Sequence, residues 1–248
     1  SASMASHEAQ PPRPPALYVH GWGVGPEGVK ARLMREYLGD AFDVRTFDCH
    51  AGGYANTITT TVIARLERFL QEQGRGAKWS LVGSSHGAYL AVLVASRRPE
   101  LVERLLLLAP AFNPQGTWVS AMCQADPSWG STAGSQAHAA DDYNQTGDGS
   151  GGLRWEFVAD LRQYAPFPSV SACPTVVVHG LQDMECKPHV TMEWVRINAD
   201  AVISAHFLHG TVPDEPMDHG LYHFAKPDST TLPNFAALLR QHWGAALP

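Results

Sequence analysis

Several features that would restrict this 248-residue sequence to particular protein classes are absent. No apolar run approaches the ~20 residues that span a bilayer, and the beginning of the sequence lacks the charged and apolar segments of a signal peptide. Basic residues are scattered, and 24 acidic residues outnumber 18 Lys and Arg, so no nucleic-acid surface is predicted. The four cysteines show neither CxxC spacing nor a dense disulfide pattern, so we expect free thiols at Cys49, Cys123, Cys173 and Cys186.

These absences, together with 44% hydrophobic residues, predict one soluble globular domain with a single core. The free thiols favour a reducing compartment, so we expect a cytoplasmic protein, or an organellar one if a transit peptide has been removed. Residues 1–15 are polar and rich in proline, and we interpret them as a cloning remnant and a disordered tail before a domain over 16–248. The sequence shows no repeat and does not indicate an oligomeric state.

Short β-branched or apolar runs alternate with longer amphipathic stretches from residue 16 onward. This alternation is typical of a parallel sheet with helices on both faces. It predicts an α/β fold with about six mostly parallel strands, at residues 16–20, 43–47, 79–83, 104–109, 175–179 and 202–208. The intervening helices are predicted at residues 28–38, 57–73, 87–96, 190–197 and 232–243.

The alternation fails after the fourth predicted strand, where Gly, Ser, Ala and Asp crowd residues 130–152. So long an irregular segment in a compact domain is usually a lid or a disordered loop, so we expect a lid insertion over about 112–165. Residues 154–164 have helical spacing. The aromatic side chains near the two ends either cover an apolar pocket or pack the lid's own small core; they are Trp118, Trp129, Trp155 and Phe157.

The segment Gly83-Ser84-Ser85-His86-Gly87 matches the pattern G-x-S-x-G and lies between a predicted buried strand and a predicted helix. In that context a sharp turn exposes the central serine and turns its neighbours away, so Ser85 and not Ser84 is the candidate nucleophile. In a glycine-rich sequence the alternative is a Gly/Ser turn with no catalytic role. The position of the motif between strand and helix favours the catalytic interpretation.

A serine hydroxyl needs a base to accept its proton and a third group to orient that base. Asp183 follows the fifth predicted strand and His219 follows the sixth, so both are expected at the sheet edge where Ser85 lies. Their order along the chain is nucleophile, acid, base, as this motif requires. Asp218 and Glu185 are rival acids, but Asp218 is a sequence neighbour of His219, and such neighbours seldom face each other in a loop.

Four motifs together resemble those of the α/β-hydrolase family, in particular its small serine hydrolases with a short lid. They are His20-Gly21-Trp22-Gly23, similar to the HGxG oxyanion loop; 81–87, similar to the nucleophile elbow; 179–183, similar to the HGxxD acid loop; and 218–221, similar to the DHGL base loop. The resemblance covers about residues 16–243 apart from the lid. It implies an α/β-hydrolase fold with a catalytic triad of Ser85, Asp183 and His219, and an oxyanion hole made by the backbone N–H groups of Trp22 and His86.

Two departures from the family pattern accompany this resemblance. The family often has a hydrophobic residue or glutamine at the position of His86, and often a valine and proline soon after the acid, where this chain has Glu185-Cys186-Lys187-Pro188. The His86 ring either hydrogen-bonds within the site or packs against the neighbouring strand. Neither departure breaks the mechanism.

The resemblance implies a serine carboxylesterase that cleaves esters of small to medium apolar acyl groups through an acyl-enzyme. Because fold alone does not fix function, an acyl thioesterase, a C–C bond hydrolase on the same triad and a non-catalytic ligand-binding homologue are the alternatives. The expected partner is a small-molecule ester. The residues expected to line its pocket are Trp22, Phe112, Trp118 and Trp155.

No cofactor and no metal ion is expected. The sequence has 12 histidines, four of them close together at His206, His209, His219 and His223, which raises the alternative of a metal site. Neither HExxH nor a paired HxH with nearby carboxylates is present, however. We therefore expect His206 to be a residue of the last strand, and His209 and His223 to flank the base loop.

Overall fold

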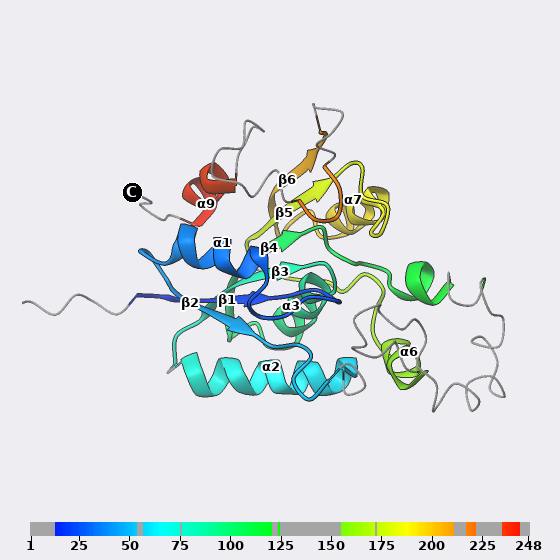
Figure 1. Ribbon diagram of the computed structural model, residues 1–248, viewed down its shortest axis with the longest axis horizontal. Coiled ribbons are helices and arrows are strands. Elements are labelled where there is room, and N and C mark those ends of the chain that lie inside the picture. The colour runs from blue at the N-terminus through cyan, green and yellow to red at the C-terminus, as the bar shows by residue number, and fades with distance from the viewer. Residues whose placement is uncertain are drawn as a thin grey trace, which may run out of the picture.

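The computed structural model describes residues 13–53, 57–74, 76–120, 124, 155–171, 173–210, 217–221 and 235–243. A six-stranded sheet lies at its centre, and every pair of neighbouring strands is parallel (Figure 1). The strands, in the spatial order β2-β1-β3-β4-β5-β6, are β1 (Pro15–Val19), β2 (Asp43–Phe47), β3 (Trp79–Ser84), β4 (Val102–Leu108), β5 (Thr175–Gly180) and β6 (Val202–Leu208). The predicted α/β architecture is confirmed.

Helices cover both faces of this sheet (Figure 1). One face carries α1 (Val29–Leu38) and α9 (Phe235–Trp243). The other face carries α2 (Thr59–Gly74), α3 (His86–Arg97), α6 (Trp155–Leu161) and α7 (Pro188–Ile197). A short π-helix, η2 (Gln115–Val119), follows β4.

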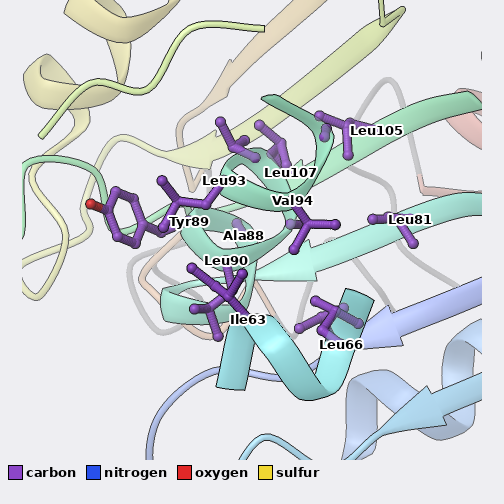
Figure 2. Packing of buried hydrophobic residues seen from close by; sticks show 14 of the residues in the cluster. Ile63, Leu66, Leu81, Ala88, Tyr89, Leu90, Leu93, Val94, Leu105 and Leu107 are labelled. Carbon is purple, nitrogen blue, oxygen red and sulfur yellow. The ribbon is translucent and has the colours of Figure 1, made fainter. Parts of the chain in front are cut away.

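The central strands are mostly apolar because both of their faces are buried. In β4, Leu105 and Leu107 belong to the hydrophobic cluster under α2 and α3, whereas Leu106 and Leu108 belong to the cluster under α1 and α9. Figure 2 shows Leu105 and Leu107 gathered with side chains of α2 and α3, including Ile63. Adjacent residues of a strand point to opposite faces, so covering both faces requires an unbroken apolar run.

Side-chain hydrogen bonds hold the two described helices of the predicted lid region, α6 to the start of α2 and η2 to the end of α6 and the segment after it. In α6, the Asp160 carboxylate accepts hydrogen bonds from the Thr60 backbone N–H at 2.8 Å and from the Thr60 hydroxyl at 2.6 Å. In η2, Gln115 Nε2 donates to the carbonyl oxygens of Leu161 at 2.9 Å and Tyr164 at 2.7 Å. The glycine-rich part of the predicted lid, with Trp129, lies outside the described residues. Of the tail predicted over residues 1–15, residues 1–12 also lie outside them, and Pro15 begins β1.

Three of the four cysteines lie in the described residues, and all three are free and buried: Cys49, Cys173 and Cys186. Cys123 is outside the described residues. Within the part of the chain that the structure describes, no helix has both the length and the apolar character needed to cross a membrane.

Candidate active site

Ser85 occupies a sharp turn between β3 and α3. Its backbone has φ 54° and ψ −123°, a conformation that a residue with a side chain rarely adopts. Close backbone contacts fix the turn, because a Cβ on Gly87 would lie 2.2 Å from the Val19 carbonyl oxygen and a Cβ on Gly83 would lie 2.4 Å from Ala88 Cα. The glycines of the motif are therefore required sterically, and the turn places Ser85 at the carboxyl edge of the sheet.

Asp183 follows β5 and accepts four hydrogen bonds. Its Oδ1 accepts from the backbone N–H groups of Glu185 at 2.9 Å and Cys186 at 2.8 Å. Its Oδ2 lies 3.0 Å from His179 Nε2 and 2.8 Å from His219 Nδ1. Burial raises the pKa of this carboxyl, but the hydrogen bonds from His179 and His219 together hold it well below its ordinary value. Asp183 is therefore a buried carboxylate that stays ionised.

The loop after β6 brings His219 to this carboxylate. A Cβ on Gly180 would lie 2.0 Å from the Met217 carbonyl oxygen, so the two loops touch through their backbones. Gln182 Oε1 also accepts a hydrogen bond from the Met217 N–H at 2.8 Å. Because His219 Nδ1 faces the Asp183 carboxylate, Nδ1 carries the ring proton and Nε2 is left to accept one.

The rival acids are placed differently from Asp183. The Glu185 carboxylate lies 3.8 Å from His219 Nε2, and its side chain is 74% exposed. Asp218 uses Oδ1 to accept the backbone N–H of Gly220 at 2.9 Å. Of these three carboxylates, Asp183 makes the short contact with the His219 ring.

The loop after β1 runs directly against Ser85. A Cβ on Gly21 would lie 2.8 Å from Ser85 Cβ and 3.4 Å from Ser85 Oγ. The loop is held by His20, whose Nε2 accepts the Cys49 backbone N–H at 3.0 Å, so that Nδ1 carries the proton and donates to the Gly21 carbonyl oxygen at 2.9 Å. The backbone next to Trp22 is thereby fixed beside the candidate nucleophile.

A cavity of about 470 Å³ opens beside Ser85 and His219. Its wall includes Trp22 from the first loop and Met184 from the acid loop. Lys30 of α1 also lines it, and its Nζ donates to Ser84 Oγ at 3.0 Å and to the His219 carbonyl oxygen at 3.5 Å. Burial lowers the pKa of Lys30 to about 8, against the opposing effect of nearby carboxylates.

The aromatic residues expected in the pocket are separated by the fold. Trp22 lines the cavity, but Phe112 lies in the core, where its ring stacks on Trp194 at a centroid distance of 4.5 Å. Trp118 packs 5.9 Å from the His86 ring instead of lining this cavity. The Trp155 side chain lies outside the described residues.

His86 is fully buried, and within the described residues neither of its ring nitrogens has a hydrogen-bond partner. Its ring lies among aromatic rings, at 5.6 Å from Phe157 and 6.1 Å from Trp22. Burial, followed by the nearby His50 and His20, lowers its pKa to about 3. The ring is therefore a neutral packing group, while the backbone N–H at the start of α3 stays beside Ser85.

The C-terminal histidines do not gather around a common point in the described structure. His206 lies in β6, where Nε2 is 2.6 Å from Ser204 Oγ, and His209 is exposed. His223 lies outside the described residues. Three contributors to the site were not predicted from the sequence: Lys30, Cys186 and the His179 ring. Only His179 had a visible indication, since it opens the HGxxD motif.

Comparisons with solved structures agree with this architecture. Alpha/beta hydrolase domain-containing protein 10 from mouse superposes with a TM-score of 0.65 at 18% identity, covering 86% of this chain and 84% of that one. Est1E from Butyrivibrio proteoclasticus gives a TM-score of 0.61 at 16% identity, covering 87% and 84%. A monoacylglycerol lipase from Paleococcus ferrophilus gives 0.55 at 16% identity, covering 80% and 87%. At these identities the similarity establishes the fold.

No curated protein matches the sequence. Residues 16–145, just over half of the 248, match the Uncharacterised protein family (UPF0227). The chain therefore belongs to the UPF0227 family, and its fold is that of the α/β hydrolases.

Proposed function

We propose that the protein is a serine hydrolase that cleaves carboxylic esters of small to medium apolar acyl groups through an acyl-enzyme. One observation carries this proposal. Ser85 lies in a strained turn and lines the same cavity as His219. The Nδ1 atom of the His219 ring lies 2.8 Å from Oδ2 of the buried Asp183 carboxylate. This is the order of groups that activates a serine hydroxyl.

In the proposed mechanism Ser85 Oγ attacks the ester carbonyl while His219 Nε2 accepts its proton. The Asp183 carboxylate stabilises the imidazolium that forms and holds the ring in the tautomer with Nε2 free. His219 then returns the proton to the leaving alcohol, and Ser85 keeps the acyl group. Water attacks the acyl-enzyme with the same base, which releases the acid and restores Ser85.

The oxyanion of each tetrahedral intermediate would be held by the backbone N–H groups of Trp22 and His86. Two placements support this assignment: the Gly21 backbone packs against Ser85, and His86 begins α3 directly after it. A helix start presents N–H groups that favour a negative charge. Each such donor is typically worth about 10²- to 10³-fold in kcat.

The substrate class follows from the cavity. Its volume of about 470 Å³ suits a small molecule, and Trp22, Val24, Val29 and Met184 give it apolar surface. Two of the structural relatives bear names that fit ester cleavage: a Butyrivibrio Est1E structure contains ferulic acid, and the Paleococcus relative is a monoacylglycerol lipase. We therefore place small-molecule esters ahead of thioesters and of C–C bond cleavage.

The test is labelling with a fluorophosphonate probe together with turnover of a p-nitrophenyl ester series. Ser85→Ala should lose both labelling and turnover. Ser80→Ala is the matched control, since Ser80 is a buried serine of β3 whose hydroxyl has no hydrogen-bond partner in the described structure. Absence of labelling in folded wild-type protein would favour the non-catalytic ligand-binding alternative, and preference for a thioester series would favour the thioesterase.

A further inference from the structure

Cys186 brings a thiol into the same cluster as the proposed acid and base. One ligand atom from each of Asp183, Cys186 and His219 lies within 4.8 Å of the other two. Asp183 and Cys186 are buried, and the His219 side chain keeps 17% exposure. The Ser85 hydroxyl also interacts with the thiol. A carboxylate, a thiol and an imidazole therefore converge beside a cavity.

We propose that Asp183, Cys186 and His219 form a binding site for a thiophilic divalent cation, zinc fitting best, and that zinc bound there stops hydrolysis. The binding site is independent of what the protein catalyses. Only the inhibition rests on the function proposed above.

The ligand set and its spacing suit zinc. Thiolate, imidazole and carboxylate are the ligands that zinc takes in proteins, and three of them leave a fourth position for water or for Ser85 Oγ. Bonds of about 2.0–2.3 Å in a tetrahedron place ligand atoms about 3.3–3.6 Å apart. His219 Nδ1 and Asp183 Oδ2 are 2.8 Å apart, and the three ligand atoms all lie within 4.8 Å of one another. Side-chain shifts of about 1 Å therefore complete the geometry.

The surrounding charge also favours a cation. Three carboxylates, those of Asp183, Asp218 and Glu185, act on the Lys30 ammonium group. Magnesium and calcium prefer oxygen ligands, so a thiol and an imidazole select against them. The local excess of negative charge attracts a divalent ion, and the ligand types choose a soft one.

Zinc binding would convert the Cys186 thiol to a thiolate and release one proton to water. The ion, the thiolate and the Asp183 carboxylate then carry no net charge together, which suits a buried site. If His219 binds through Nε2, its lone pair is used; if it binds through Nδ1, its proton moves through water to Nε2. In both cases the ring can no longer accept the Ser85 proton.

Direct oxidation is a less suitable role for this cysteine. Burial, followed by the charge of Asp183, raises the pKa of the Cys186 thiol, and the Ser85 hydroxyl offsets this only in part. The thiolate that reacts with oxidants is therefore scarce. A metal ion overcomes the same penalty because it binds the thiolate directly.

Metal binding can be measured apart from catalysis in the Ser85→Ala protein. Cobalt(II) would be titrated in, the thiolate-to-cobalt charge-transfer absorbance recorded, and zinc then added to displace it. Cys186→Val and Cys186→Ser would be added to the same background. Cys173→Val is the control, because Cys173 is equally buried but lies at the opposite end of β5 from Asp183. Thermal unfolding would verify that each variant is folded.

We expect one cobalt ion per chain, a charge-transfer band, and full displacement by zinc. Both Cys186 variants should weaken binding by more than about tenfold, a loss that even outer-shell changes can cause, while Cys173→Val should not. In wild-type protein, zinc should inhibit ester turnover reversibly, and chelation should restore it. Absence of the charge-transfer band, or cobalt binding by both Cys186 variants as tight as in the Ser85→Ala protein, would overturn the proposed metal site. If no ester is turned over, the proposed function fails while the cobalt titration still decides the metal site.

Discussion

In the proposed mechanism, the charge of Asp183 decides whether His219 can act as a base. Asp183→Asn removes that charge while keeping the shape of the side chain. In asparagine, the oxygen would remain with the two backbone N–H groups that Oδ1 now accepts. The NH2 group would then face the two ring nitrogens that now share Oδ2. His179 Nε2 keeps its proton because it also donates to the Cys186 carbonyl oxygen at 2.8 Å. His219 is therefore the ring that changes tautomer.

With its proton on Nε2, His219 has no lone pair for the Ser85 proton. Loss of the correct tautomer in such a triad lowers kcat by about 10⁴-fold. That factor corresponds to about 5.5 kcal/mol of transition-state stabilisation. We expect a loss of this size in kcat and little change in KM, because no group that touches bound substrate is removed.

The assay is steady-state turnover of a p-nitrophenyl ester by wild type, Asp183→Asn and Glu185→Gln. Glu185 is the matched control: its carboxylate lies 3.8 Å from His219 Nε2 and is 74% exposed, so solvent weakens the interaction. Glu185→Gln should change kcat by less than about threefold. An Asp183→Asn enzyme that keeps more than about a tenth of the wild-type kcat, or an equal loss in Glu185→Gln, would refute the assignment of the acid.

Three further predictions concern a buried charge, a backbone contact and an unpaired ring. Lys30 has a pKa of about 8 in the folded protein against an ordinary 10.5, so between these pH values the unfolded chain binds more protons than the folded one. The free energy of unfolding should therefore rise with pH between about 8 and 10.5. Denaturation of Lys30→Met should show a smaller rise with pH, and a rise equal to that of the wild type would contradict the buried-charge argument. Gly180→Ala puts a Cβ 2.0 Å from the Met217 carbonyl oxygen, so it should lower the free energy of unfolding by about 1–3 kcal/mol and remove most of the esterase activity. Gly25→Ala is the control, because a Cβ there meets no atom within 4 Å, and it should keep the wild-type Tm. His86→Leu removes two unpaired buried nitrogens and should raise the free energy of unfolding by about 1 kcal/mol or more. The gain in stability of His86→Leu should be largest at acidic pH, because the histidine of the unfolded wild type binds a proton at a higher pH than the folded ring, whose pKa is about 3. A lower free energy of unfolding in His86→Leu would show that the His86 ring has a hydrogen-bond partner.

The central strands of the sheet were predictable because they are buried on both faces. The run at residues 175–179 is β-branched from Thr175 to Val178, and β5 was found there with one additional residue. The edge strand predicted at residues 43–47 was found with the same bounds as β2. The turn at Ser85 was predictable for a local reason, since a G-x-S-x-G pattern between strand and helix leaves the backbone few conformations.

The neighbours of the site could not be predicted, because they depend on contacts between segments far apart in the sequence. A lysine in an amphipathic helix is normally solvent-exposed, yet α1 lies so that Lys30 reaches Ser84, 54 positions away. Phe112 was expected over the pocket, but the adjacent Ala111 N–H donates to the Ser85 carbonyl oxygen at 3.1 Å, and the Phe112 ring stacks on Trp194. Nothing in the sequence indicated that Cys186 would belong to the site, because only the folding of the acid loop places its thiol beside His219.

We expect the position of β6 at the edge of the described sheet to limit the thermal stability of the candidate site. His219 follows this strand in the chain. Among the strands that the structure describes, β6 pairs with β5 alone, and it is mostly half-exposed, whereas Ser85 follows the fully buried β3. Edge elements open at a lower free energy than central ones. We therefore expect inactivation by heat to begin where β6 detaches, while the turn at Ser85 and the core remain folded. A variant with a longer half-life at high temperature should therefore be sought by strengthening the contact between β5 and β6, because a more stable central sheet would leave the detachment of β6 unchanged.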